Sequence, residues 1–230
     1  FQEYAIRAIS EWTDAKVAVV LREPAARVYS SFSYTKNNLA RLNSSLSFQD
    51  YLDLIDAGES LYPRWCSHPG SAFALERDIQ YSAYVHYLRL WLNAIGRERL
   101  FPIVFESMRA SPMETIVSMV DWLSIDKKPI EDIDCGSKNE TINVRSQAGQ
   151  RILQMVNRRI RFPSPLRRKA KKLIYSFQAA NASISNRDLK AIMDLRSRYI
   201  KDNKNLEELL QISLSQWEST VQAEAEKWRV

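Results

Sequence analysis

The chain has 230 residues, of which 45% are hydrophobic, 26% charged and 10% aromatic, a globular composition that excludes a disordered chain. Its longest apolar runs are of strand length, so we expect no transmembrane helix. The net charge of +6 favours an anionic partner. We predict one domain over residues 1–230. The chain opens without Met and in the middle of a helical pattern, so we expect its N-terminus to be incomplete.

The predicted elements follow the order of an α/β chain, with a small parallel sheet flanked by helices and a helix-rich C-terminal half. Two apolar runs are predicted strands, KVAVVL at 16–21 and LFPIVFE at 100–106. The first has no polar residue after Lys16, which is typical of a parallel strand covered on both faces. Residues 61–73, rich in turn formers, and residues 125–147 are predicted loops. Helical patterns lie, in chain order, at residues 5–12, 25–37, 45–58, 74–96, 111–123, 148–160, 165–178, 185–203, 205–210 and 215–228.

Three of the predicted helices begin with a capping signal. Ser47 and Ser185 each precede an apolar-periodic run. Ser111 is followed by Pro112 and Glu114, the pattern of a capping box with proline at the first helical position. We therefore expect these serines to be N-caps.

The junction between the first strand and its helix carries donors suited to an anion. Arg22 follows the strand directly, and Ser30 lies about two turns into a helix that begins at Pro24. In open parallel sheets, ligands bind beyond the carboxyl ends of the strands, often at the next helix. A guanidinium offers a fork of charged donors and a hydroxyl offers one neutral donor. Together they favour a phosphate monoester over a carboxylate or a metal.

The stretch from Leu21 to Ser30, a strand end followed by Arg-x-Pro-x-x-Arg-x-x-Ser, resembles a known nucleotide-binding segment. It is similar to the 3′-phosphate-binding segment of sulfotransferases that use 3′-phosphoadenosine 5′-phosphosulfate (PAPS). The resemblance implies that Arg22 and Ser30 bind the 3′-phosphate of the nucleotide. Arg27 is the weaker match in role, because the family often uses this arginine structurally.

Further segments of the chain resemble segments of the same family, in the same order. Together with Leu21–Ser30 they cover most of residues 10–217. A loop at Asn143 and Arg145 lies where these enzymes often carry a basic loop that closes over the nucleotide, so the resemblance makes Arg145 a nucleotide contact. Tyr84 is a second nucleotide-binding candidate. The pattern is equally compatible with a side chain in the core and with one that faces the cleft. The matched positions are Tyr84, Leu88, Trp91 and Leu92; Phe105, Glu106, Met108, Pro112, Trp122 and Leu123; and Tyr199, Asn203, Leu206 and Trp217.

The resemblance implies a P-loop-like sulfotransferase fold, with residues 148–230 as the helical C-terminal part of the same domain. The family's glycine- and lysine-containing loop for the 5′-phosphosulfate has no counterpart among the five glycines, so we expect that loop and the general base upstream of Phe1. Within the chain, His68 and Glu106 are the remaining catalytic candidates. A lone loop histidine is more often a bystander, and Glu106 either pairs with a nearby arginine, orients a ligand arginine or serves the acceptor.

The function implied is transfer of a sulfuryl group from PAPS to a hydroxyl or amine, with a carbohydrate or glycolipid as the expected acceptor and no metal. The basic stretch 151–172 holds no acidic residue and is interpreted as a solvated face, a membrane-binding surface or an attractor of anionic acceptors. Arg64, Trp65 and Arg77 are candidates to flank the acceptor.

Two alternative functions stay open: a P-loop kinase relative that uses ATP, and a non-catalytic basic module that binds membranes or polyanions. No motif indicates nucleic acid. Cys66 and Cys135 form no metal-binding pattern, and we favour two thiols in a reducing cytoplasm over a disulfide. We expect a cytoplasmic protein, with association to an anionic membrane as the alternative.

Overall fold

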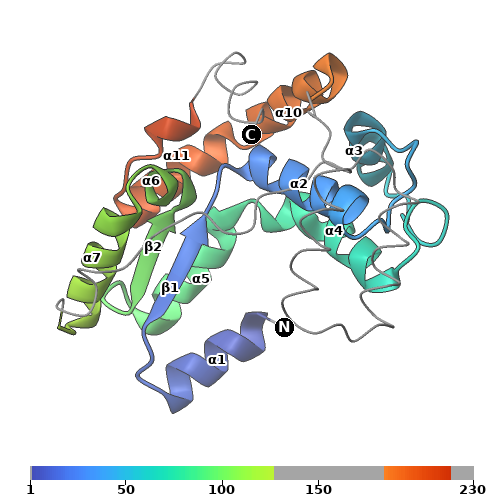
Figure 1. Ribbon diagram of the computed structural model, residues 1–230. Helices are drawn as coiled ribbons and strands as arrows, with labels where there is room; N and C mark the ends of the chain where they lie inside the picture. Colours follow the sequence, from blue (N-terminus) through green and yellow to red (C-terminus); the bar gives the residue numbers. More distant parts are fainter. Residues whose placement is uncertain (1, 127–183, 219–230) are drawn as a thin grey trace, which may run out of the picture. The chain divides into compact units, whose positions relative to one another are not determined.

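The computed structural model describes residues 2–126 and 184–218 (Figure 1). These residues divide into two compact units. Unit 1 contains residues 2–24, 81–126 and 196–218, and unit 2 contains residues 25–80 and 184–195. That residues 1–230 form one domain stays a prediction, since much of its C-terminal part, 148–230, lies outside the described residues.

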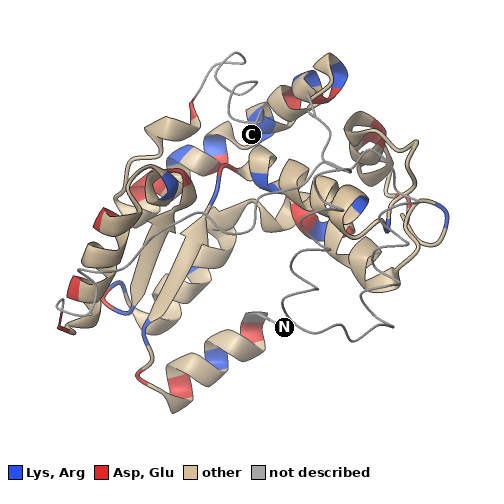
Figure 2. Ribbon diagram, viewed as in Figure 1, with Lys and Arg blue, Asp and Glu red and all other residues tan. Residues whose placement is uncertain are grey.

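Unit 1 is built on a sheet of two parallel strands, β1 (Val17–Leu21) and β2 (Leu100–Val104). Val17 pairs with Leu100 and Leu21 with Val104, so the strands end together and share a carboxyl edge (Figure 1). Neither strand carries a charged residue, and charges begin where the strands end (Figure 2). The prediction of an α/β chain with a small parallel sheet is therefore confirmed.

Two details of the strand predictions are wrong. Burial alternates along β1 and Val20 is 52% exposed, so the strand is not covered on both faces. The described helices that pack on the sheet leave this side of β1 open. The second strand ends at Val104, where a short helix, α6 (Phe105–Ala110), begins, so Glu106 lies in the first turn of a helix. A carboxylate there is favoured by the partial positive charge of the helix N-terminus.

Helices of unit 1 pack against the sheet and one another, and an apolar cluster forms among the strands, α5, α11 and the C-terminal turn. The helix α5 contacts β2, α1 and α11, and α7 contacts β2. The bounds are α1 (Gln2–Trp12), α5 (Tyr84–Ile95), α7 (Pro112–Leu123), α11 (Ile200–Leu210) and a 3-10 turn (Ser215–Trp217). The buried cluster consists of Leu21, Val85, Leu88, Ile95, Leu100, Leu206, Leu210, Leu214 and Trp217. The C-terminal segment thus completes the core that supports β1.

Unit 2 is helical and holds an aromatic core. Phe48 and Tyr51 stack with their ring centroids 5.8 Å apart, and Phe32 lies within 5.4 Å of both rings. The Tyr51 hydroxyl donates to the backbone oxygen of Leu75 at 2.8 Å. Its elements are α2 (Pro24–Ser33), a π-helical turn (Tyr34–Asn38), α3 (Phe48–Asp56), α4 (Pro69–Tyr81) and most of α10 (Asn186–Arg198).

The long helix predicted over 74–96 is two helices, α4 and α5, separated at Ser82 and Ala83. Buried positions explain the break: α4 buries residues 72, 75 and 78, whereas α5 buries residues 85, 88 and 95. At about 100° per residue, these two sets do not share one face of a continuous helix. The loop predicted over 61–73 is shorter than expected, because Pro69 is the first residue of α4.

The two C-terminal helices are separated at a different residue from the one predicted. The break lies at Tyr199, between α10 and α11, and not near residue 204. Ser185 caps α10 as predicted, since its hydroxyl accepts from the Asp188 N–H at 3.0 Å. Ser111 occupies the N-cap position of α7, but its side chain makes no capping hydrogen bond. The predicted elements at 148–160 and 165–178, and nearly all of 125–147 and 215–228, lie outside the described residues.

Ser47 caps α3 through a capping box with Asp50, as each side chain accepts from the other residue's backbone N–H. We expect Ser47→Ala to cost about 1 kcal/mol of unfolding free energy at pH 7. The Ser47 hydrogen bond is the main cause that lowers the pKa of Asp50 below its ordinary 3.8. A depressed pKa stabilises the fold above pH 3.8, and this contribution is lost as the pH falls through the folded pKa.

The cost of Ser47→Ala should therefore shrink in acid. Guanidinium unfolding at pH 7 and at about pH 3 measures it. The control is Ser45→Ala, which removes an exposed hydroxyl that donates to the side chain of the exposed Asn43 and should change stability by less than about 0.5 kcal/mol. Equal losses for the two variants would contradict the capping role.

Candidate functional site

The candidate site in unit 1 lies at the exit of β1, where a single peptide group is held at both ends. The hydroxyl of Tyr84 donates to the backbone oxygen of Arg22 at 3.0 Å. Oε1 of Glu106 accepts from the backbone N–H of Glu23, also at 3.0 Å. Both groups belong to the one peptide unit that joins Arg22 and Glu23. The structure thus brings together Arg22, Tyr84 and Glu106, three residues that the sequence singled out.

The guanidinium of Arg22 is partly withdrawn from water. Its Cζ lies 5.1 Å from the centroid of the Phe105 ring, within the range of a cation–π contact. Burial lowers the pKa of Arg22, while the nearby Glu106 and Tyr84 oppose that shift. Arg109 of α6 adds a second positive charge and lowers the pKa further. A partly desolvated cation beside another cation favours an incoming anion, because charge–charge attraction strengthens as water is excluded.

Glu106 also connects the strand exit to the C-terminal turn. Its Oε2 accepts from the indole Nε1–H of Trp217 at 2.8 Å, so each carboxylate oxygen has an N–H donor. Trp217 is buried in the core of unit 1. Its indole therefore fixes the carboxylate that holds the Glu23 amide.

The side chain of Glu23 is fixed as well. Oε2 of Glu23 lies 3.1 Å from Nη2 of Arg196, and only 5% and 11% of the two side chains are exposed. A buried pair of this kind is favourable only with both charges present. Sequence reasoning missed Glu23, Arg196 and the role of Trp217. The sequence carried no specific signal for the pair, because only the burial of Glu23, seen in the structure, requires a partner for its charge.

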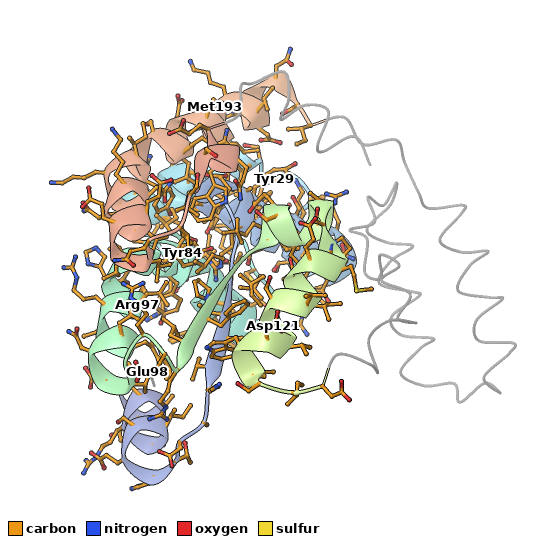
Figure 3. The ribbon with its side chains drawn as sticks, turned by 90° about the vertical axis from the view of Figure 1, so that its left-hand side faces the viewer. Tyr29, Tyr84, Arg97, Glu98, Asp121 and Met193 are labelled. Atoms are coloured by element: carbon orange, nitrogen blue, oxygen red, sulfur yellow. The ribbon has the colours of Figure 1, made fainter. Side chains whose placement is uncertain are left out.

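Tyr84 is half-buried in α5, with its ring centroid 6.4 Å from that of Trp217. Figure 3 shows Tyr84 among the packed side chains near β2 and α11, in agreement with the contacts of α5 with both elements. Its ring thus belongs to the packed region and its hydroxyl to the strand exit. Arg97, also labelled there, donates to the backbone oxygens of Leu209 and Leu210 and caps α11 (Figure 3).

The remaining site candidates among the described residues belong to unit 2. Ser30 is half-buried in the second turn of α2. Arg27, on the same helix, forms an ion pair with the buried Asp78 at 3.3 Å, which supports a structural role for it. Burial raises the pKa of Asp78, and hydrogen bonding from Ser31 together with Arg27 opposes that rise.

His68 is exposed and caps α4, since its Nδ1 accepts from the backbone N–H of Ser71 at 3.2 Å. The predicted acceptor residues are engaged locally: the guanidinium of Arg64 lies over the ring of Trp65 and that of Arg77 over the ring of Phe73. Cys66 is a free, buried thiol. Arg145, Cys135 and the basic stretch 151–172 lie outside the described residues.

A comparison with protein families gives one decisive match: the sulfotransferase domain model matches residues 8–148, more than half of the chain. The chain belongs to the sulfotransferase domain family. The matched segment includes both strands, Arg22, Ser30, Tyr84 and Glu106. The predicted family is thereby confirmed.

The fold is also similar to the crystal structure of a sulfotransferase from Alicyclobacillus acidocaldarius, with a TM-score of 0.54 and 16% sequence identity. The match covers 93% of this chain and 62% of the Alicyclobacillus protein, so this chain spans less than two thirds of that protein's length. The likeness supports the P-loop-like sulfotransferase fold. A comparison with curated protein sequences gave no match.

Within residues 2–126 and 184–218, no helix is both long enough and apolar enough to cross a bilayer. Within the same ranges, no three His, Cys, Asp or Glu side chains are grouped as metal ligands.

Proposed function

We propose that this protein transfers the sulfuryl group of PAPS to a hydroxyl or amine, with a carbohydrate or glycolipid as acceptor. The observation that carries the proposal is the strand exit: within the segment that matches the sulfotransferase domain, Arg22 leaves β1 on a peptide group held from both sides. A partly buried guanidinium at a parallel strand's carboxyl end is suited to a nucleotide phosphate.

In the proposed mechanism, Arg22 and Ser30 bind the 3′-phosphate and thereby align the donor for transfer. The S–O bond to the 5′-phosphate breaks, a new bond forms from sulfur to the acceptor (S–O with a hydroxyl, S–N with an amine), and the acceptor's proton passes to a base. The products are the sulfated acceptor and adenosine 3′,5′-bisphosphate. This scheme requires no metal.

We assign the role of base to neither His68 nor Glu106. Both carboxylate oxygens of Glu106 already accept N–H hydrogen bonds, and the Nδ1 of His68 caps a helix. We retain Arg145 as a proposed nucleotide contact. The basic stretch 151–172 is proposed to attract an anionic acceptor or an anionic membrane surface.

The test is transfer of radiolabelled sulfate from PAPS by the full encoded protein. The acceptor panel contains neutral and anionic glycans, glycolipids and simple amines, each assayed with and without EDTA. We expect label on a glycan or glycolipid, with EDTA causing no loss. Phosphoryl transfer from ATP and magnesium, without sulfate transfer, would favour the kinase alternative. Salt-sensitive binding to anionic vesicles without any transfer would favour the non-catalytic module.

A further inference from the structure

The most constrained group at the β1 exit is the peptide unit between Arg22 and Glu23. Its carbonyl oxygen accepts from the Tyr84 hydroxyl, and its N–H donates to Glu106, each at 3.0 Å. These two contacts fix the orientation of the peptide plane. The Glu23 side chain is held separately by Arg196, at 3.1 Å.

The orientation of this peptide decides where the Arg22 side chain starts. The carbonyl carbon of this peptide is one of the three backbone atoms that set the direction of the Arg22 Cα–Cβ bond, and the guanidinium is at the end of a long, flexible side chain. A small rotation at the backbone therefore moves the charged group by a larger distance. Binding groups must be held within about 0.5 Å to act well, and supporting hydrogen bonds provide that precision.

We propose that Tyr84 and Glu106 are positioning residues that orient Arg22 toward an anion through the Arg22–Glu23 peptide. This inference rests on the proposed function for the identity of the anion, the 3′-phosphate of the nucleotide. Trp217 takes part indirectly, because its indole N–H holds the second oxygen of Glu106 at 2.8 Å. The orientation of the strand exit then depends on the C-terminal turn.

Direct roles for the two residues fit the contacts less well. Each oxygen of Glu106 already accepts an N–H hydrogen bond, and although each keeps a second lone pair, taking the acceptor's proton would weaken the two bonds that hold the Glu23 amide and the Trp217 indole. The hydroxyl of Tyr84 uses its single proton on the Arg22 oxygen, so it has none to donate to a phosphate. Both residues are therefore better placed to act through Arg22 than to touch the nucleotide.

The test is a double-mutant cycle read out as the affinity for adenosine 3′,5′-bisphosphate, measured by calorimetry on the full encoded protein. The variants are Tyr84→Phe, Glu106→Gln and Arg22→Ala, alone and in pairs. We expect Tyr84→Phe and Glu106→Gln each to raise the Kd by roughly 3- to 15-fold. If they act through the guanidinium, neither raises the Kd further once Arg22 is alanine. The proposal would be overturned if Tyr84→Phe and Glu106→Gln raised the Kd by the same factor in the Arg22→Ala protein as in the parent.

The control for Tyr84→Phe is Tyr87→Phe, which removes a hydroxyl from the same helix at a position that packs on Tyr81. It should leave the Kd unchanged. If Tyr84→Phe and Glu106→Gln also leave it unchanged while Arg22→Ala weakens binding, the positioning role fails and the proposed function survives. If the parent protein does not bind adenosine 3′,5′-bisphosphate, the proposed function itself fails.

A rescue variant separates positioning from general loss of structure. In Glu106→Gln, the new amide has one acceptor oxygen for two N–H donors, so its NH2 group must face one of them. Adding Trp217→Phe removes the indole donor and leaves the amide oxygen for the Glu23 N–H. We expect the pair Glu106→Gln and Trp217→Phe to bind the nucleotide more tightly than Glu106→Gln alone. Weaker or equal binding by the pair would contradict the proposed network.

Discussion

Replacing Arg22 by alanine is expected to raise the Kd for adenosine 3′,5′-bisphosphate by roughly 10- to 150-fold. This corresponds to the ~1.5–3 kcal/mol of a charge-assisted hydrogen bond. The loss should be large because the guanidinium is partly desolvated and held over Phe105, so little reorganisation accompanies binding. Calorimetry on the parent and the variant measures the change.

Two variants control for this result. Arg7→Ala removes the same charge from an exposed position on α1, where Arg7 pairs with Glu11, and should leave the Kd within about twofold. Arg22→Lys keeps the charge but loses the planar fork, and should bind with an intermediate Kd. An Arg22→Ala protein that binds as tightly as the parent would remove Arg22 from the site.

Replacing Arg196 by methionine is expected to lower the unfolding free energy by about 3–5 kcal/mol. The change removes the guanidinium that lies 3.1 Å from a buried carboxylate, and the cost of burying the Glu23 charge without this ion pair dominates. Guanidinium unfolding at pH 7 measures the loss. The strand exit should also become less rigid, since Glu23 adjoins the peptide that Tyr84 and Glu106 hold.

The same helix offers a matched control. Arg187 of α10 pairs with Asp50 at 2.7 Å, but 61% and 41% of the two side chains are exposed. Because water screens such a pair, Arg187→Met should cost only about 0–1 kcal/mol. Adding Glu23→Gln to Arg196→Met should recover part of its loss by removing the buried charge. If Arg196→Met and Arg187→Met lowered the unfolding free energy by similar amounts, burial would not be what makes the Glu23–Arg196 pair important.

The sheet was predictable because its signal is local. Two apolar runs without polar interruption predict buried strands, and a helical stretch between them predicts a parallel pair. The position of Arg22 at the strand exit follows directly from that reading. The helix breaks at Ser82 and at Tyr199 were not predicted, because neither carries a proline or glycine signal. Both follow from which positions each helix buries, and tertiary packing decides that.

The sequence was enough to predict Arg22 as the phosphate-binding residue, but not the residues that hold its backbone in place. Arg22 was found from its place after a strand and from the family pattern. The Glu23–Arg196 pair joins residues 173 positions apart, and no periodicity connects them. Glu106 was placed at the end of a strand, although it lies in the first turn of α6. Its bond to Trp217 depends on how the C-terminal turn packs, which the sequence pattern does not reveal.

The central claim is that a guanidinium at the β1 exit recognises a 3′-phosphate. The most direct measurement compares the affinities of adenosine 3′,5′-bisphosphate and adenosine 5′-monophosphate, for the parent and for Arg22→Ala. We expect the bisphosphate to bind the parent at least about tenfold more tightly, and most of this preference to disappear in the variant. Equal affinities in the parent, or a preference that survives the loss of Arg22, would contradict the account.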